Sequence, residues 1–261
     1  MPLDAPASSS PQENRSLQAE IYRLYAALTS TGSFREASGL GGRLLYAGEL
    51  SAESRALISA ANIAGAASLA ASADSSTQRA AIRDGVVDFL VTSLEEALRI
   101  LKNEIRKRQA VSVCVALPPG LLTAQMLDRG VLPDLLPPSD SSSHAEDAFI
   151  SLGAHRLQTT TQSENPYTTW SVDRDHSRWL PRIDASVTTL LPASDQTRLR
   201  WLRLAPRYLG RVAQRQHGLA LSASETEQLR TDLRQLSHQH NTDPGSVPEV
   251  TIDPIPTKSS S

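Results

Sequence analysis

The sequence predicts an α/β protein built on a doubly wound parallel sheet, followed by a small α-rich region. Between residues 15 and 136, short apolar segments of strand length alternate with segments whose apolar residues recur every three or four positions. Val111–Leu117 (VSVCVAL) is continuously apolar, which is typical of a parallel strand buried on both faces. Alternating strands and helices at this spacing favour right-handed crossovers, and such a sheet binds ligands beyond the carboxyl ends of its strands.

The first elements follow from local patterns. Apolar residues at helical spacing predict a helix over residues 17–28, and Arg43–Ala47 is a short strand. Ser51 can cap a helix that runs through an alanine-rich segment to about Gly65. Ala66–Ala71 is expected as a buried strand.

The later elements carry clear helix signals. Residues 77–84 form a short helix that ends at Gly85, which supplies a left-handed cap. Ser93 and Glu96 form a capping box, and the helix that they open is acidic in its first turn and basic in its last, as the helix dipole favours. The remaining predicted elements are a strand at Val86–Val91, the strand at Val111–Leu117 and a helix that stops at Gly130.

Composition divides the chain into four segments. Residues 1–14 and 241–261 are rich in Pro and Ser and poor in large apolar residues, so we predict disordered termini. Residues 15–146 hold the parallel-sheet domain. Residues 147–240 form the small α-rich region, which begins with a Ser/Thr-rich connector.

Charge and cysteine content exclude several classes of protein. The chain has 261 residues, with 26 basic and 28 acidic side chains, which excludes a globally basic nucleic-acid binder. Its single cysteine, Cys114, excludes an internal disulfide and fits a reducing compartment. The polar N-terminus lacks a secretory signal, and the uncharged stretch Leu57–Ala73 is too weakly apolar to span a bilayer. We therefore expect a cytoplasmic protein without membrane contact.

Four segments together resemble a known family. They are NIAGAASL (Asn62–Leu69), GVVDFLVTSLEEAL (Gly85–Leu98), AVSVCVAL (Ala110–Leu117) and DRGVLPDLL (Asp128–Leu136). In this order and spacing, residues 42–144 resemble the Rossmann-like NAD-binding domain of urocanase, the urocanate hydratase of histidine catabolism. The resemblance implies a Rossmann-like fold, a cytoplasmic homodimer, and a tightly held NAD that acts as an electrophile in a hydro-lyase reaction. It also implies a larger substrate domain, which this chain largely lacks.

The sequence departs from the family at the phosphate-binding turn. Where the family has a glycine-rich turn after its first strand, this chain has GELSAESRALI at Gly48–Ile58, and Glu49 and Glu53 bring negative charge toward a diphosphate. In the family, an acidic residue after the second strand is expected to bind the ribose hydroxyls. The corresponding residue in this chain is Ser72, and Asp74 follows two residues later. These replacements argue against NAD binding in the family's manner.

Four residues remain as cofactor-binding candidates. A shift of the alignment would bring the GLGG segment Gly39–Gly42 onto the family turn, which makes Gly41 and Gly42 candidates, although the segment precedes the first strand. Asp140 and His144 correspond loosely to a polar loop of the family. NAD is thus the cofactor to test, and no metal is expected.

Three functions follow from these observations. The first is a non-catalytic relative of urocanase with a binding or regulatory role. The second is a urocanate hydratase that uses NAD, or a partner subunit of one, either as a homodimer or in association with a full-length urocanase. The third is an unrelated nucleotide or small-molecule binder. No catalytic residue is assigned, because Asp175 in the RDH segment lacks the residues that follow it in the family and is interpreted as a surface turn residue.

Other candidate side chains have simpler interpretations. Cys114 is expected to be a buried apolar side chain, and the six histidines show no spacing typical of a metal site. Arginines recur every three or four residues after Ser194, with Pro206 predicted to interrupt their helix. Their stripe is either a solvated helix face or a surface that contacts an acidic partner, phosphates or nucleic acid. Its members are Arg200, Arg203, Arg207, Arg211 and Arg215.

Overall fold

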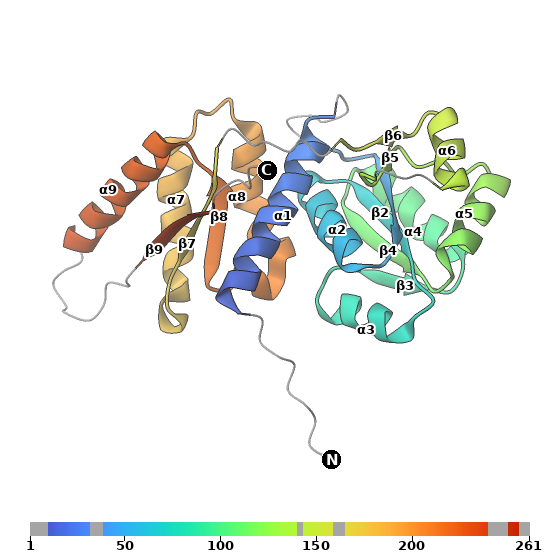
Figure 1. Cartoon of the computed structure of the whole chain (residues 1–261), viewed down its shortest axis with the longest axis horizontal. Coiled ribbons are helices and arrows are strands. Elements are labelled where there is room, and N and C mark those ends of the chain that lie inside the picture. Colours follow the sequence, from blue (N-terminus) through green and yellow to red (C-terminus); the bar gives the residue numbers. More distant parts are fainter. Residues whose placement is uncertain (1–9, 32–38, 140–142, 159–164, 240–249, 256–261) are drawn as a thin grey trace, which may run out of the picture.

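Two layered units lie side by side in the protein (Figure 1). A computed structural model describes residues 10–31, 39–139, 143–158, 165–239 and 250–255. One unit holds a six-stranded sheet and the other a three-stranded sheet. Helix α1 (Pro11–Thr29) lies between them. None of the helices in these described ranges is long and apolar enough to cross a membrane.

The larger sheet is entirely parallel, as predicted. Its strand order is β3-β4-β2-β1-β5-β6. The chain moves outward from β1 in one direction and later returns to the other side of β1, so the order reverses between β1 and β5. This reversal marks the topological switch point where such sheets bind ligands. The strands are β1 (Leu44–Glu49), β2 (Ala67–Ala71), β3 (Phe89–Val91), β4 (Val111–Val115), β5 (Leu135–Leu136) and β6 (His155–Arg156).

Helices cover both faces of this sheet, which confirms the Rossmann-like fold. Alternate residues along a strand belong to different apolar clusters, because successive strand side chains point to opposite faces. Ala70 packs in the cluster that contains α2, whereas Leu69 packs with Leu94 and Phe149 on the other face. The helices are α2 (Ala52–Ala64), α3 (Ser75–Arg83), α4 (Leu94–Lys107), α5 (Pro119–Asp128) and α6 (His144–Ser151).

The helix boundaries follow from capping side chains. Ser51, Ser93 and Ser143 each accept a hydrogen bond from a backbone N–H of the helix that they precede. Gly85 has a φ of +72°, which is the left-handed conformation predicted for it. Capping residues in the local sequence therefore determine these helix boundaries of the parallel-sheet unit.

The described structure extends beyond three predicted boundaries. The parallel sheet continues past residue 146, since β6 pairs with β5. Helix α1 begins at Pro11, inside the predicted disordered N-terminus, because Ser10 and Glu13 form a capping box. In the predicted disordered tail, β9 (Thr251–Ile255) pairs with β7 (Tyr167–Ser171). Residues 1–9 lie outside the described residues.

The second unit contains an antiparallel sheet as well as the predicted helices. Its strand order is β8-β7-β9, and Thr168, Thr169 and Trp170 of the central strand are buried. These strands were not predicted because YTTWS and QHGLA lack a clear alternation of apolar and polar residues. The other elements are η1 (Arg174–Trp179), α7 (Leu180–Leu190), α8 (Gln196–Leu209), η2 (Gly210–Ala213), β8 (Gln216–Ala220) and α9 (Ala223–Gln239).

An aromatic cluster joins the two units through α1. The ring of Tyr22 lies 4.9 Å from that of Trp201 in an edge-to-face arrangement and 5.3 Å from that of Tyr167. Tyr25 lies 5.2 Å from Trp201, and its hydroxyl donates to the Thr197 carbonyl at 2.8 Å. Because α1 also packs on α2, one apolar core runs from the parallel sheet into the second unit.

Candidate functional site

The switch point between β1 and β5 is the place to look for a ligand. Its walls are the turn from β1 into α2 and the segment from β5 into α6. The first wall begins with a register irregularity between Tyr46 and Gly48, and Gly48 has a φ of +76°. Glu49, the last residue of β1, is exposed. A carboxylate therefore stands where the chain leaves the sheet.

The N-terminus of α2 is closed by its own side chains. The Ser51 hydroxyl accepts from the Ser54 N–H at 3.3 Å, and the Ser54 hydroxyl accepts from the Ser51 N–H at 2.8 Å. The Ser54 hydroxyl also donates to the carbonyl of Glu49 at 2.5 Å. Two backbone donors that could face a phosphate at a helix N-terminus are thus already used.

Glu53 adds a negative charge at the same helix end. The Ser51 hydroxyl donates to its carboxylate at 2.7 Å, and this bond, together with the backbone N–H of Glu53, lowers the pKa of the carboxyl group. Glu53 is therefore ionised at neutral pH. Its charge occupies the position where the helix dipole would otherwise attract an anion.

The acidic residue after β2 is also engaged. Asp74 caps α3 and accepts from the N–H groups of Ser76 and Thr77 at 3.0 Å each and from their hydroxyls at 2.6 Å each. Hydrogen bonds from Ser76 and Thr77 hold the pKa of Asp74 well below its usual range. Buried Ser72 accepts from the Asp74 N–H at 3.2 Å. The Asp74 carboxylate is thus committed to the helix cap.

The structure separates the predicted cofactor-binding residues. Gly41 and Gly42 precede β1 and so lie at the amino edge of the sheet, where a Cβ on Gly42 would meet Arg108 and the Ile105 carbonyl of α4 at 3.9 Å. His144 opens α6 after β5 and is exposed at the carboxyl edge. Asp140 lies outside the described residues. The glycines and His144 therefore do not form one site.

The GLGG segment packs at the junction of the two units. Gly39 has a φ of +60°, and a Cβ there would lie 2.0 Å from the Ala64 carbonyl and 2.9 Å from the guanidinium carbon of Arg200. The neighbouring N–H of Leu40 donates to the same Ala64 carbonyl at 2.8 Å. Close packing explains the glycine at this position without any ligand.

The structure also shows where two other candidate residues, Cys114 and Asp175, are located. Cys114 is buried, as predicted, and burial raises the pKa of its thiol to about 11. Asp175 is exposed on η1, in the second unit. No group of three or more potential metal ligands occurs within the described ranges.

Sequence reasoning missed a partly buried chain of polar contacts in the second unit. The Asp184 carboxylate accepts from Trp170 Nε1 at 3.0 Å and contacts His217 Nδ1 at 2.7 Å. The three residues lie on β7, α7 and β8, so no local pattern connects them. Asp184 and His217 line a small pocket under α8, which Trp201, Leu202, Ala205, Pro206, Leu209 and Gly218 complete.

The predicted interruption of the arginine stripe at Pro206 was wrong. Helix α8 continues through Pro206 and ends at Leu209, and the break falls at Gly210, whose φ is +55°. The loss of one backbone donor at Pro206 is tolerated because the adjacent turns pack on the core through Leu202 and Ala205. Arg200 turns inward, whereas the other stripe residues, Arg203, Arg207, Arg211 and Arg215, are exposed.

Comparison with protein families identifies the family of the parallel-sheet unit. The family described as the urocanase Rossmann-like domain matches residues 23–165, which is more than half of the chain. The match begins within α1, includes all strands of the parallel sheet and stops two residues before β7.

Proposed function

The chain belongs to the urocanase family through its Rossmann-like domain, and on that premise we propose that it is a non-catalytic binding protein that does not hold NAD in the manner of its family. The family's Rossmann domain is associated with NAD binding, so the absence of a suitable phosphate site would be a change within the family. The closed N-terminus of α2 carries this proposal.

The residues at the switch point do not fit a dinucleotide diphosphate. A phosphate there would face the carboxylates of Glu49 and Glu53, and the capping box of Ser51 and Ser54 would have to open. Removal of a helix cap costs about 1 kcal/mol, and two nearby like charges oppose an anion further. The ribose position offers only Ser72 and an Asp74 carboxylate that already accepts four hydrogen bonds.

Calorimetric titration of the full chain with NAD tests the proposal. We expect no heat of binding at micromolar NAD, no ultraviolet absorbance from co-purified dinucleotide, and no loss of urocanate absorbance on mixing with that substrate. Stoichiometric NAD binding or retained dinucleotide would overturn the proposal and favour a hydratase or a partner subunit of one.

A matched pair of variants tests the physical reason. Glu49→Gly with Glu53→Gln removes both carboxylates from the α2 terminus, whereas Glu95→Gln with Glu104→Gln removes two carboxylates from α4. If charge opposes the diphosphate, only the first pair raises the affinity for NAD. Equal affinity of the wild-type protein and both pairs for NAD, at any level above background, would contradict the argument.

A further inference from the structure

We propose that four exposed arginines of the second unit form a docking surface for an acidic segment of a partner protein. We call this surface the arginine face; it consists of Arg203, Arg207, Arg211 and Arg215. It extends from α8 through η2 to the start of β8. The proposal goes beyond the proposed function, because it holds whether or not the chain binds NAD.

The positive charges of the arginine face are not paired with acidic side chains of the described residues. All four side chains are exposed, and none of them forms an ion pair with an acidic side chain within the described ranges. The Arg207 guanidinium lies 5.3 Å from the ring of Tyr208, which holds it against the helix without neutralising its charge.

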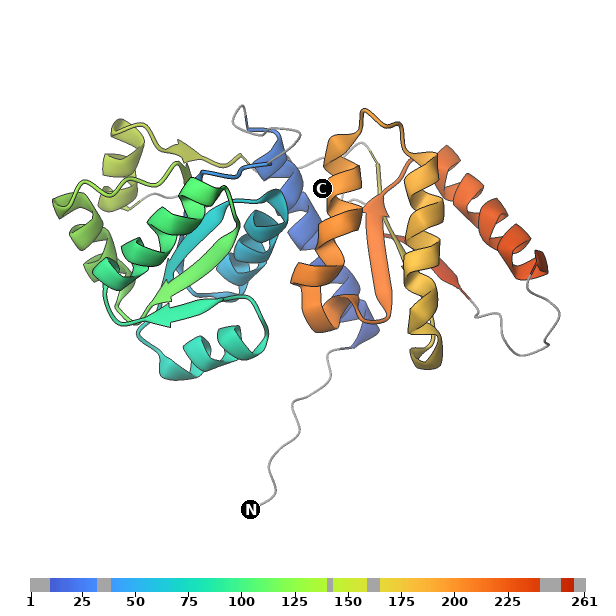
Figure 2. The same ribbon diagram turned by 180° about the vertical axis from the view of Figure 1, so that it is seen from behind.

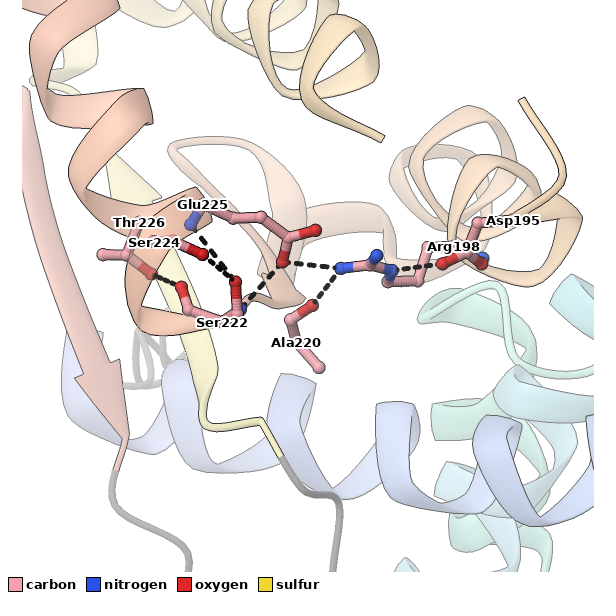
Figure 3. A network of polar contacts seen from close by, with 7 residues as sticks. All are labelled: Asp195, Arg198, Ala220, Ser222, Ser224, Glu225 and Thr226. Carbon is pink, nitrogen blue, oxygen red and sulfur yellow. Dashed lines mark hydrogen bonds and ion pairs between the residues drawn. The ribbon is translucent and has the colours of Figure 1, made fainter. Parts of the chain in front are cut away.

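Two other arginines of α8, Arg198 and Arg200, form hydrogen bonds within the protein. Arg198 donates to Glu225 at 2.9 Å, to Asp195 at 2.6 Å and to the Ala220 carbonyl at 3.2 Å (Figure 3). Although partial burial alone would lower the pKa of Arg198, hydrogen bonds from its guanidinium to Glu225 and Asp195 raise it. Arg200 donates to the Ile63 carbonyl. Helix α8 therefore directs Arg198 and Arg200 into contacts within the protein and leaves Arg203 and Arg207 exposed, and Arg211 and Arg215 are exposed beyond its end.

The excess of positive charge in the second unit supports a role of these arginines in binding a partner. Residues 165–239 contain eleven arginines and seven acidic residues, although the whole chain has a net charge of −2. Arg203 and Arg207 are one helical turn apart, and like charges at this spacing destabilise a helix. A negatively charged partner would remove this repulsion.

The spacing of Arg203 and Arg207 and the state of the neighbouring aromatic residues favour a protein partner over single-stranded nucleic acid. Arg203 and Arg207, four residues apart on α8, are separated by about 6 Å along the helix axis, which matches carboxylates four residues apart on an acidic helix. Proteins that bind single-stranded nucleic acid add exposed aromatic rings for stacking. On α8, however, Trp201 is buried and Tyr208 lies under Arg207.

Binding of a fluorescent helical peptide with glutamate at every fourth position tests the proposal. We expect the full chain to bind it with an affinity that falls as salt rises. The triple variant Arg203→Glu, Arg207→Glu, Arg211→Glu should weaken binding by roughly tenfold or more, because attraction becomes repulsion. Circular dichroism would establish that the variant folds, and Arg203→Gln with Arg207→Gln provides a milder test.

A control variant separates this surface from general attraction. Arg79, Arg106 and Arg129 are exposed on the parallel-sheet unit, and their triple change to Glu alters the net charge equally. The proposal requires this control to bind the peptide like the wild-type protein. Equal weakening by both triple variants, no binding of the peptide, or tighter binding of a single-stranded DNA oligonucleotide at the same arginines would overturn it. The NAD titration is independent of every one of these outcomes.

Discussion

Arg200 joins the two units by donating from Nε to the carbonyl of Ile63 at 2.8 Å. Ile63 lies in the last turn of α2, where carbonyl groups lack partners within the helix. The guanidinium satisfies one of these groups and places its charge at the negative end of the helix dipole. Figure 2 shows α8 from behind, on the side of its unit that faces the parallel sheet.

Loss of this contact should destabilise the protein. We expect Arg200→Ala to lower the free energy of unfolding by about 1.5–3 kcal/mol, because a charge-assisted hydrogen bond is lost and a carbonyl is left unpaired. Arg203→Ala, on an exposed neighbour, should change it by about 0.5 kcal/mol at most. Urea denaturation measures both values. Equal effects would mean that Arg200 does not connect the units energetically.

Substitution of Gly39 should be costly for two separable reasons. Gly39→Ala adds a Cβ 2.0 Å from the Ala64 carbonyl in a left-handed backbone, so we expect a loss of about 3–5 kcal/mol. Gly85→Ala has the same backbone cost, about 1–2 kcal/mol, in open space. Thermal and urea unfolding of the two variants compare the costs. If the two losses were the same, the close approach at Gly39 would be irrelevant to stability.

Removal of the Asp184 carboxylate should leave one buried and one partly buried side chain without their acceptor. For Asp184→Ala we expect a loss of about 2–4 kcal/mol, since Trp170 Nε1 and His217 Nδ1 lose their acceptor. Asp184→Asn should recover part of the loss, because its amide oxygen retains one acceptor. Asp175→Ala is the exposed control. A neutral Asp184→Ala, measured by urea denaturation, would show that this chain of polar groups contributes nothing.

Acid should destabilise the protein partly through Glu225. Although burial alone would raise the pKa of Glu225, hydrogen bonds from Arg198 and from the Ser222 backbone lower it below its ordinary value of 4.5. The unfolded state therefore binds this proton first, and the stabilising contribution, present above about pH 4.5, is lost as the pH falls through the folded-state pKa.

Glu225→Gln should remove that component of the pH dependence. Chemical denaturation at a series of pH values would show a shallower decline for the variant than for the wild-type protein. Glu95→Gln, which changes an exposed carboxylate paired with Arg99, reports the general effect of losing a surface charge. Parallel declines in wild type and Glu225→Gln would contradict the role of the Arg198 network.

The parallel sheet could be predicted because its signals are local. Val111–Val115 is apolar except for Ser112, and Ser51 and Ser93 open helices that begin where their capping patterns place them. Strand β3 is shorter than predicted, since only Phe89–Val91 pairs with β4 at the edge of the sheet. The local sequence thus predicts that a strand is present, while pairing with β4 determines how long it is.

The second unit could not be predicted in the same way. Strand β9 pairs with β7, with Ser171 opposite Thr251 and Tyr167 opposite Ile255, so no local pattern reports the contact. Arg200 points inward because α2 ends at a position where its guanidinium can reach the Ile63 carbonyl. Gly41 and His144 are separated because they lie at opposite edges of the parallel sheet. These relationships exist only once the chain has folded.

The position of α1 has a consequence for how the molecule can be divided. A fragment that stops at residue 165, the border of the family match, would retain Tyr22 and Tyr25 but lose Trp201 and Tyr167, against which they pack. The same cut would expose the side of α2 that contacts α8. We therefore expect the segment matched by the family to depend on the second unit for its stability, and truncation at the border of the match to yield insoluble material.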